Sequence, residues 1–297
     1  MTKVKVLCVG AAVVDFVFYL DTFPQRAEKY GTETASVVGG GCAASAAVAV
    51  ARLGGSAVLG ARLGDDRIGD LILADLSAEG VDVSNVTRTA GARSSFSSIL
   101  VDAQGERQIV NYRGAGLVLD TGWFGAQTEL GAVLTDTRRT GAALDALDLA
   151  RSRGIPGIVD GEAPIDPAIL SRASHVAFSM QGLRSLVPDR NPAEALQQIA
   201  DTHGCWSAVT DGEHGVWFTG ASGIDHIPAF PVKPRDTLGA GDVWHGAFAL
   251  SLAEGRAEPQ AIRFANAAAA LKCLKTGGRD GCPSRADVTE FLQETSR

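Results

Sequence analysis

The sequence predicts an α/β fold in which helices cover a mostly parallel sheet. Short, apolar, β-branched runs alternate with helical patterns along most of the chain. The 297 residues suffice for one large α/β unit, and 35 glycines allow many tight turns. Two segments with an extended pattern, residues 15–38 and 94–115, interrupt this alternation and predict a second, smaller sheet.

The elements of the main sheet follow in chain order. Short apolar runs predict strands, and longer runs with a 3.6-residue period predict helices. The expected strands are Val4–Val9, Ala57–Gly60, Ala132–Thr135, Gly157–Asp160, His175–Phe178 and Ser207–Thr210. The expected helices are Ala43–Leu53, Asp70–Glu79, Leu144–Arg153, Pro192–His203 and Val243–Glu254. Because such sheets bind ligands at the carboxyl ends of their strands, residues just after a strand are candidate site residues.

The two extended segments predict a lid. Asp15–Val38 has no helical period, and Ser94–Arg113 shows two alternating strands about a Gly-containing turn. A small sheet built from these two insertions would stand beside the main sheet and cover a site. No linker separates independent units, so we expect a single domain over residues 1–297.

Composition excludes several classes of function. The chain has 34 acidic and 27 basic residues, a net charge of −7 and no basic stripe, so we expect no nucleic-acid partner. Its apolar runs fall short of the roughly 20 residues that span a bilayer, and the first residues lack the pattern of a secretory signal. We therefore expect no membrane association and a cytoplasmic location. The histidines show no metal-ligand spacing, and we expect the five cysteines, which form no C-x-x-C pair, to be reduced and structural.

The segment Pro234–Asp242, which reads PRDTLGAGD, carries the clearest chemical signal. Gly239 and Gly241, with Ala240 between them, let the backbone turn so that its N–H groups and the following helix N-terminus form an anion hole. Asp242 falls in the first turn of that helix, where a carboxylate can accept a proton from an attacking hydroxyl. Alone, the motif is also compatible with a favourable first-turn acid that has no catalytic role.

DTLGAGD resembles the D-T-x-G-A-G-D signature of ribokinase-like (PfkB) sugar kinases, and the resemblance covers nearly the whole chain. The segment 60–69 resembles the family's G-x-x-G-x-D-x-x-G element as well, with Gly64, Asp66 and Gly69 at its last three fixed positions. The resemblance implies a three-layer α/β/α core with a β-sheet lid, ATP as phosphoryl donor, Mg²⁺, and Asp242 as the catalytic base. It also implies sugar binding by a set of lid and glycine-rich-segment residues: Asp15, Gly39, Gly40, Gly41 and Ser45, the last in place of the family's usual Asn.

The same resemblance implies a nucleotide site. The turn from Thr210 to Gly215 is similar to the family's T-x-G-x-x-G element, and the segment around Asn266 resembles its adenine side. The implied nucleotide-binding residues are Thr210, Gly212, Gly215, Thr237, Asn266 and Gly278. The family's N-x-x-E element, which helps hold Mg²⁺, is replaced by residues 179–182, SMQG, so the group that organises Mg²⁺ stays open. A monovalent cation, K⁺, is a further expectation near Asp236.

Three residues predict an anionic substrate. Lys29 and Asn111 lie in the lid segments and Arg138 follows a strand, and their side chains can all donate to an oxyanion. Within the family the chain most closely resembles 6-deoxy-6-sulfofructose kinases, whose sulfonate pocket uses a Lys, an Asn and an Arg at matching positions. This implies phosphorylation of 6-deoxy-6-sulfofructose to its 1-phosphate. Fructose 6-phosphate, fructose and ribose are the alternative substrates, and with the last two these three side chains would be ordinary surface residues.

Two alternative functions lie outside the sugar kinases. A Rossmann-type dehydrogenase lacks support, because no G-x-G-x-x-G follows the first strand. A non-catalytic sugar- or nucleotide-binding protein would have no need of a base such as Asp242 beside its anion hole. We also expect a homodimer through the lid, because exposed sheet edges can pair and twofold dimers are the commonest soluble oligomers.

Overall fold

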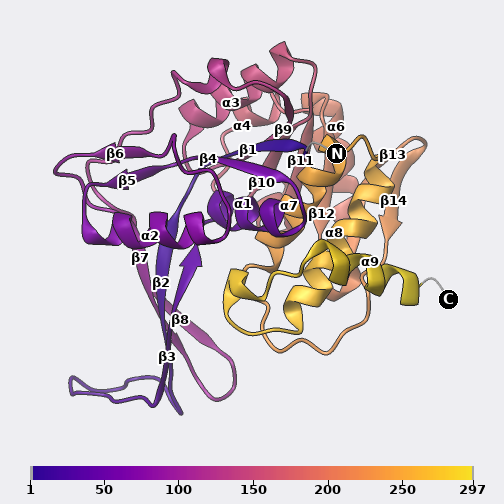
Figure 1. Ribbon diagram of the computed structural model, residues 1–297. Coiled ribbons are helices and arrows are strands. Elements are labelled where there is room, and N and C mark those ends of the chain that lie inside the picture. The colour runs from indigo at the N-terminus through magenta and orange to yellow at the C-terminus, as the bar shows by residue number, and fades with distance from the viewer. Residues whose placement is uncertain (1–2, 296–297) are drawn as a thin grey trace.

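The computed structural model describes residues 3–295 and places a large sheet between two layers of helices (Figure 1). The strand order is β14-β13-β12-β11-β10-β9-β1-β4, and the strands from β12 to β4 pair in parallel. Their bounds are β1 Lys5–Val9, β4 Ser56–Gly60, β9 Leu130–Asp136, β10 Gly157–Gly161, β11 His175–Ser179, β12 Trp206–Thr210, β13 Val216–Gly220 and β14 Gly223–Ile227. The α/β fold class is confirmed. The antiparallel edge strands β13 and β14 were not expected.

Helices cover both faces of this sheet. One layer contains α1 Cys42–Arg52, α2 Arg67–Ala78, α7 Ala240–Ala253, α8 Glu258–Cys273 and α9 Arg285–Glu294. The other contains α3 Thr140–Ser152, α4 Pro167–Leu170, α5 Met180–Leu186 and α6 Pro192–His203. Within residues 3–295, no helix is long and apolar enough to span a bilayer.

The predicted boundaries hold best where burial defines them. All six predicted strands agree with the structure to within two residues at each end. Helices α2, α3 and α7 begin three or four residues earlier than predicted, because their first turns contain polar or glycine residues that carry no apolar period. At α2, for example, the side chain of Asp66 caps the helix by accepting from Gly69 N.

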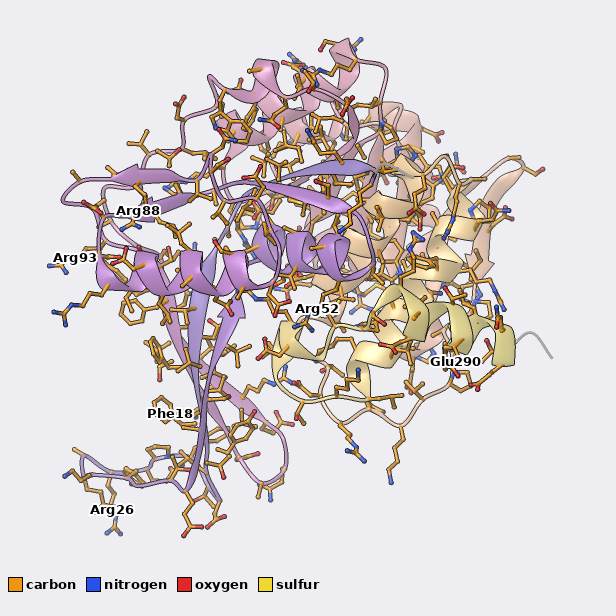
Figure 2. All side chains as sticks on the ribbon, viewed as in Figure 1. Phe18, Arg26, Arg52, Arg88, Arg93 and Glu290 are labelled. Carbon is orange, nitrogen blue, oxygen red and sulfur yellow. The ribbon has the colours of Figure 1, made fainter. Side chains whose placement is uncertain are left out.

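The two extended segments form one separate sheet, as predicted. Its order is β3-β2-β7-β8, with bounds β2 Val13–Tyr19, β3 Thr34–Gly40, β7 Phe96–Val101 and β8 Arg107–Tyr112. We call these four strands the lid sheet. It projects from the main body, and the loop 20–33 joins β2 to β3 at its far end, where Arg26 lies (Figure 2). A short pair, β5 Arg62–Gly64 and β6 Thr87–Thr89, completes the strands of the described chain.

Candidate active site

The glycine-rich turn before α7 has the geometry of an anion hole. Gly239 is the N-cap of α7 with φ +74°, in the left-handed region that favours glycine, and no side chain caps this helix end. No atom lies within 4 Å of where a Cβ on Gly241 would stand. The uncapped first turn of α7 borders a cavity that a phosphoryl group can enter.

Asp242 occupies the first turn of α7 beside that space. Burial by the surrounding protein, with the negative charge of Asp160, raises the pKa of Asp242 to about 7, although His245 and a hydrogen bond from Ser45 act in the opposite direction. A carboxylate with a raised pKa is a stronger base than an ordinary Asp and is well suited to accept a proton near neutral pH. Ser45, which the sequence assigned to sugar binding, thus contacts the candidate base itself.

Two further carboxylates lie at the carboxyl ends of neighbouring strands. Asp136 ends β9, and its carboxylate accepts hydrogen bonds from Ala11 N at 2.7 Å and Arg138 N at 3.0 Å. Burial raises the pKa of Asp136 to about 6. Asp160 lies near the end of β10, and one of its oxygens, a carboxylate oxygen of Asp242 and Cys42 Sγ all lie within 4.8 Å of one another. The candidate site is therefore acidic at its base.

His245 supplies positive charge beneath these carboxylates. Its Nδ1 lies 2.8 Å from Gly241 O, and its Nε2 lies 3.1 Å from Ala177 O and 3.6 Å from an Asp160 oxygen. Both ring nitrogens face acceptors, so both need to carry a hydrogen. Burial lowers the pKa of His245, but Asp160 and the two carbonyls raise it by more, and the net direction is upward. His245 therefore lies one helical turn after Asp242 with both ring nitrogens held by backbone carbonyls.

The lid sheet brings a row of polar side chains to the site. Asp15 on β2 pairs in register with Ser97 on β7, which in turn pairs with Asn111 on β8. Asn111 Nδ2 donates to Ser97 Oγ at 2.9 Å, and Ser97 hydrogen-bonds Asp15. A Cβ on Gly40 would stand 2.5 Å from Asp15 Oδ2, so only glycine lets this carboxylate lie against the backbone there. The row joins Asp15 and Asn111 to the glycine-rich segment.

Arg279, which sequence analysis did not assign to the site, lies directly against Gly39. A Cβ on Gly39 would stand less than 3.0 Å from Nη2, Cζ and Nε of this guanidinium. Arg279 is 2% exposed and forms an ion pair with Asp75 on α2, and its Nε and Nη1 have no hydrogen-bond partner in the described chain. Burial raises the pKa of Asp15, whereas Ser97 and the Arg279 charge lower it. Arg279 thus links the base of the lid to the main body.

The three predicted anion-binding residues make different contacts in the structure. Arg138 lies at the carboxyl end of β9, contacts Cys42 and donates from Nη1 to Ala163 O at 3.0 Å. Asn111 belongs to the polar row of the lid. Lys29 is exposed in the loop 20–33, which joins β2 to β3 at the far end of the lid sheet (Figure 1).

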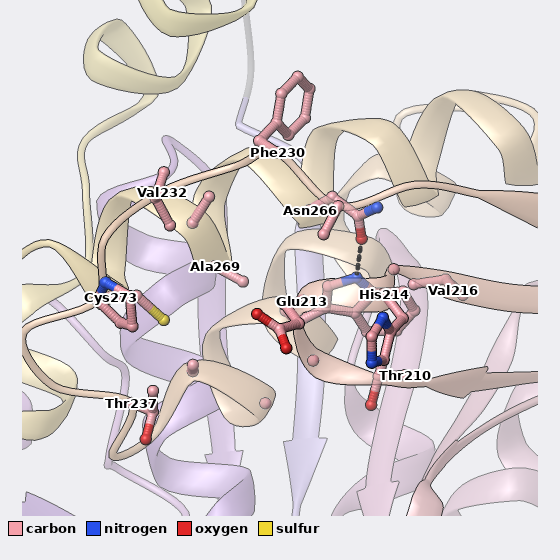
Figure 3. Close-up of a pocket in the computed structure, with 18 of the residues that line it drawn as sticks. Thr210, Glu213, His214, Val216, Phe230, Val232, Thr237, Asn266, Ala269 and Cys273 are labelled. Atoms are coloured by element: carbon pink, nitrogen blue, oxygen red, sulfur yellow. Dashed lines mark hydrogen bonds between the residues drawn. The ribbon is translucent and has the colours of Figure 1, made fainter.

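The predicted nucleotide residues surround a cavity of about 610 Å³ (Figure 3). Five of the six line it: Thr210, Gly212, Gly215, Thr237 and Asn266. Asn266 Oδ1 accepts from Trp244 Nε1 at 2.8 Å, and Nδ2 donates to Pro228 O at 3.2 Å, so the amide is fixed in one orientation. Gly241 also lines the cavity, which therefore ends at the anion hole.

Gly278, the sixth predicted nucleotide residue, lines a second cavity of about 400 Å³ between the lid sheet and the Pro234–Leu238 segment. Thr237 lines both cavities. At the position of the missing N-x-x-E element, Ser179 caps α5 by accepting from Gly182 N at 2.9 Å. This segment, residues 179–182, supplies a helix cap and no carboxylate.

Comparison with known proteins decides the family. A family model described as pfkB family carbohydrate kinase matches residues 3–285. The chain belongs to this family. Ribokinase from Bacillus subtilis is 31% identical over 97% of this chain and 99% of its own length. Fructokinase-1 from Zea mays is 27% identical, over 86% of this chain and 88% of its own length.

Solved structures support the assignment of this chain to the PfkB family. A protein from Agrobacterium tumefaciens is 38% identical and superposes with a TM-score of 0.91 over 99% of both chains. Ribokinase from Thermotoga maritima is 26% identical, with a TM-score of 0.84 over 98% of this chain and 99% of that one. This PfkB-family protein is therefore an ATP-dependent carbohydrate kinase with a ribokinase-like fold.

Several residues of the candidate site were missed by sequence reasoning. Asp136 and Asp160 could have been found, because each lies at or near the carboxyl end of a predicted parallel strand. His245 could have been noticed because it follows Asp242 by three residues and so lies on the same helix face. Arg279 gave no sequence signal of its own.

Proposed function

We propose that this kinase transfers the γ-phosphoryl group of ATP to the 1-hydroxyl of 6-deoxy-6-sulfofructose. The position of Arg138 is the observation that supports an anionic substrate. Its guanidinium contacts Cys42, whose Sγ is within 4.8 Å of an Asp242 oxygen, and its bond to Ala163 O leaves further donors of the planar fork for a ligand. A sulfonate at one end of the sugar can then pair with Arg138 while a hydroxyl at the other end approaches Asp242.

The chemical step follows from the proposed roles. Asp15 and the Gly39–Gly41 segment hold sugar hydroxyls, with Ser97 and Asn111 orienting the Asp15 carboxylate. Asp242 accepts the hydroxyl proton as the sugar oxygen forms its bond to the γ-phosphorus and the bond to the β-phosphate oxygen breaks. The first-turn N–H groups of α7 stabilise the charge on the transferring group, and ADP and the sugar 1-phosphate leave.

Mg²⁺ belongs to this proposal as the partner of the nucleotide phosphates, whose charge it neutralises. Asp160 is the carboxylate beside Asp242 that we propose to help hold the ion, directly or through water. Cys42 is not a suitable ligand, because burial raises the pKa of its thiol well above the usual value and Mg²⁺ prefers oxygen.

We also propose a homodimer that forms through the lid sheet. Val37, Phe96, Val110 and Tyr112 share the face of this sheet opposite Asp15, and Val110 is 75% exposed and Val37 54% exposed. An apolar face of this kind favours burial against a second copy. The cysteines, all free, fit the proposed cytoplasmic location.

A comparison of four candidate substrates distinguishes the proposed function from its alternatives. Specificity constants would be measured for 6-deoxy-6-sulfofructose, fructose 6-phosphate, fructose and ribose under identical ATP and Mg²⁺, with ADP formation as readout. We expect sulfofructose to have the highest value. A preference for fructose 6-phosphate would keep the anion pocket and change its ligand, because that substrate offers an anion at the same end. A preference for fructose or ribose would remove the role proposed for Arg138.

A further inference from the structure

Two backbone segments meet beneath the anion hole. The segment 235–238 precedes Gly239, and the segment 272–278 comprises the last two residues of α8 and the loop after it. Arg235 N and Asp236 N both donate to Cys273 O, at 2.7 and 3.2 Å. The position of the first turn of α7 therefore depends on how firmly these two segments are held together.

Lys272 is buried between these segments. Its side chain is 0% exposed, and its ammonium donates to Asp236 O at 2.8 Å and lies 3.4 Å from Asp236 Oδ2. A buried lysine needs such partners, because an ammonium without them is strongly disfavoured in the protein interior. Lys272 thus places one fixed positive charge against both the carbonyl and the carboxylate of Asp236.

Both carboxylate oxygens of Asp236 are also engaged with other donors. Asp236 Oδ1 accepts from Leu238 N at 2.9 Å and from Arg107 at 3.2 Å, and Oδ2 accepts from Gly277 N and Gly278 N, each at 3.1 Å. A monovalent metal ion requires several oxygens that are free to face it, and the charge on Lys272 repels a second cation. The residues present do not fit the K⁺ ion that the sequence led us to expect near Asp236.

We propose that the Lys272 ammonium takes the place of a monovalent cation and fixes the segment that ends in the catalytic turn. The charge bonds Asp236, the Asp236 carboxylate holds Leu238 N, and Gly239 follows as the N-cap of α7. Because the cation is covalently attached, the turn is formed without an ion from solution. Lys272 is thus a positioning residue that acts through Asp236, and phosphoryl transfer by the wild-type enzyme is independent of K⁺.

The first experiment uses the wild-type enzyme. Initial rates with ATP, Mg²⁺ and whichever sugar the enzyme phosphorylates would be compared in KCl, NaCl and tetramethylammonium chloride at equal ionic strength. We expect the three rates to agree within roughly twofold, since no ion-dependent ordering step precedes catalysis. Activation of several-fold by K⁺ would overturn the inference. The inference rests on the proposed phosphoryl transfer. If that proposal fails, no product forms in any salt, an outcome that differs from activation by K⁺.

The second experiment removes the charge. Lys272→Met and Lys272→Ala should lower kcat roughly 10- to 100-fold through displacement of the turn, and K⁺ or NH₄⁺ should restore part of the loss, more in the Ala variant because it leaves more room. Lys275→Met, three residues away and exposed, should retain wild-type kcat in every salt. Circular dichroism would verify folding. Full activity in Lys272→Met would contradict a cationic role, as would a folded variant whose lost kcat no added cation restores. If the variants do not fold, the comparison of salts with the wild-type enzyme decides.

Discussion

Gly39→Ala tests how the lid is joined to the core. The added Cβ would overlap three atoms of the Arg279 guanidinium, so a small rotation cannot relieve the clash and the side chain must move. Displacement breaks the ion pair between Arg279, whose side chain is 1% exposed, and Asp75. Breaking a buried pair costs about 3–5 kcal/mol, and since the Asp75 side chain is 39% exposed, solvent screening lowers our expectation to about 2–4 kcal/mol.

For a chain of 297 residues, an unfolding entropy of about 2.1 cal/mol/K per residue converts this loss into a Tm decrease of about 3–6 °C. Thermal and urea unfolding would measure it. The matched control is Gly31→Ala, also within the lid segments, where no atom lies within 4 Å of an added Cβ. The control should change the free energy of unfolding by less than about 0.5 kcal/mol.

A double-mutant cycle isolates the cause. If Gly39→Ala acts by displacing Arg279, the same substitution in an Arg279→Ala background should cost less than about 1 kcal/mol, because the clash no longer exists. Equal costs in both backgrounds would refute this reasoning, as would a Gly39→Ala protein as stable as the Gly31→Ala control.

Three further predictions concern the site and the assembly. Burial raises the pKa of Asp242 to about 7 and the base acts when ionised, so kcat/KM should rise with pH through about 7. His245→Gln should shift this rise to higher pH, because it removes a positive charge that favours the ionised carboxylate. An unshifted pH profile in His245→Gln would contradict this role of His245. Arg138→Ala should lower kcat/KM for sulfofructose by tens- to thousands-fold, a loss of about 2–5 kcal/mol, and barely affect fructose, whereas equal losses would indicate general damage. Light scattering should report a dimer for the wild-type protein. Val110→Lys should dissociate this dimer, whereas the control Val118→Lys, at another exposed apolar position, should not. A monomeric wild-type protein would contradict the proposed dimer.

The parts of the fold that a local pattern defines could be predicted from the sequence. Parallel strands buried on both faces appear as short apolar runs, and all six predicted strands were correct. The anion-hole turn was also readable, because Gly239 must adopt a left-handed conformation and Asp242 must follow within the first helical turn. The sequence did not predict the edge strands β13 and β14, because their antiparallel arrangement depends on pairing with β12 and not on a local pattern.

Contacts between distant segments were the part that could not be predicted. Arg279 lies 240 residues after Gly39, and neither local sequence pattern predicts that the two residues are in contact. Lys272 appears within a helical run, where its burial against Asp236 depends on the packing of two loops. Lys29 and Arg138 were both assigned to the anion pocket, but Lys29 lies exposed in the loop 20–33, whereas Arg138 follows the end of β9 by two residues.

The role of Asp242 as catalytic base is most directly tested by Asp242→Asn, which keeps the shape of the side chain and removes its basicity. The turnover number should fall roughly 10²–10⁴-fold while ATP affinity, measured by calorimetry, stays nearly constant. Asp70→Asn is the matched control, because Asp70 is also a first-turn acid, on α2, where it pairs with Arg88. Asp70→Asn should retain wild-type turnover. A decrease of only two- or threefold in Asp242→Asn would show that Asp242, like Asp70, is an ordinary helix-start acid, and would contradict the proposed mechanism.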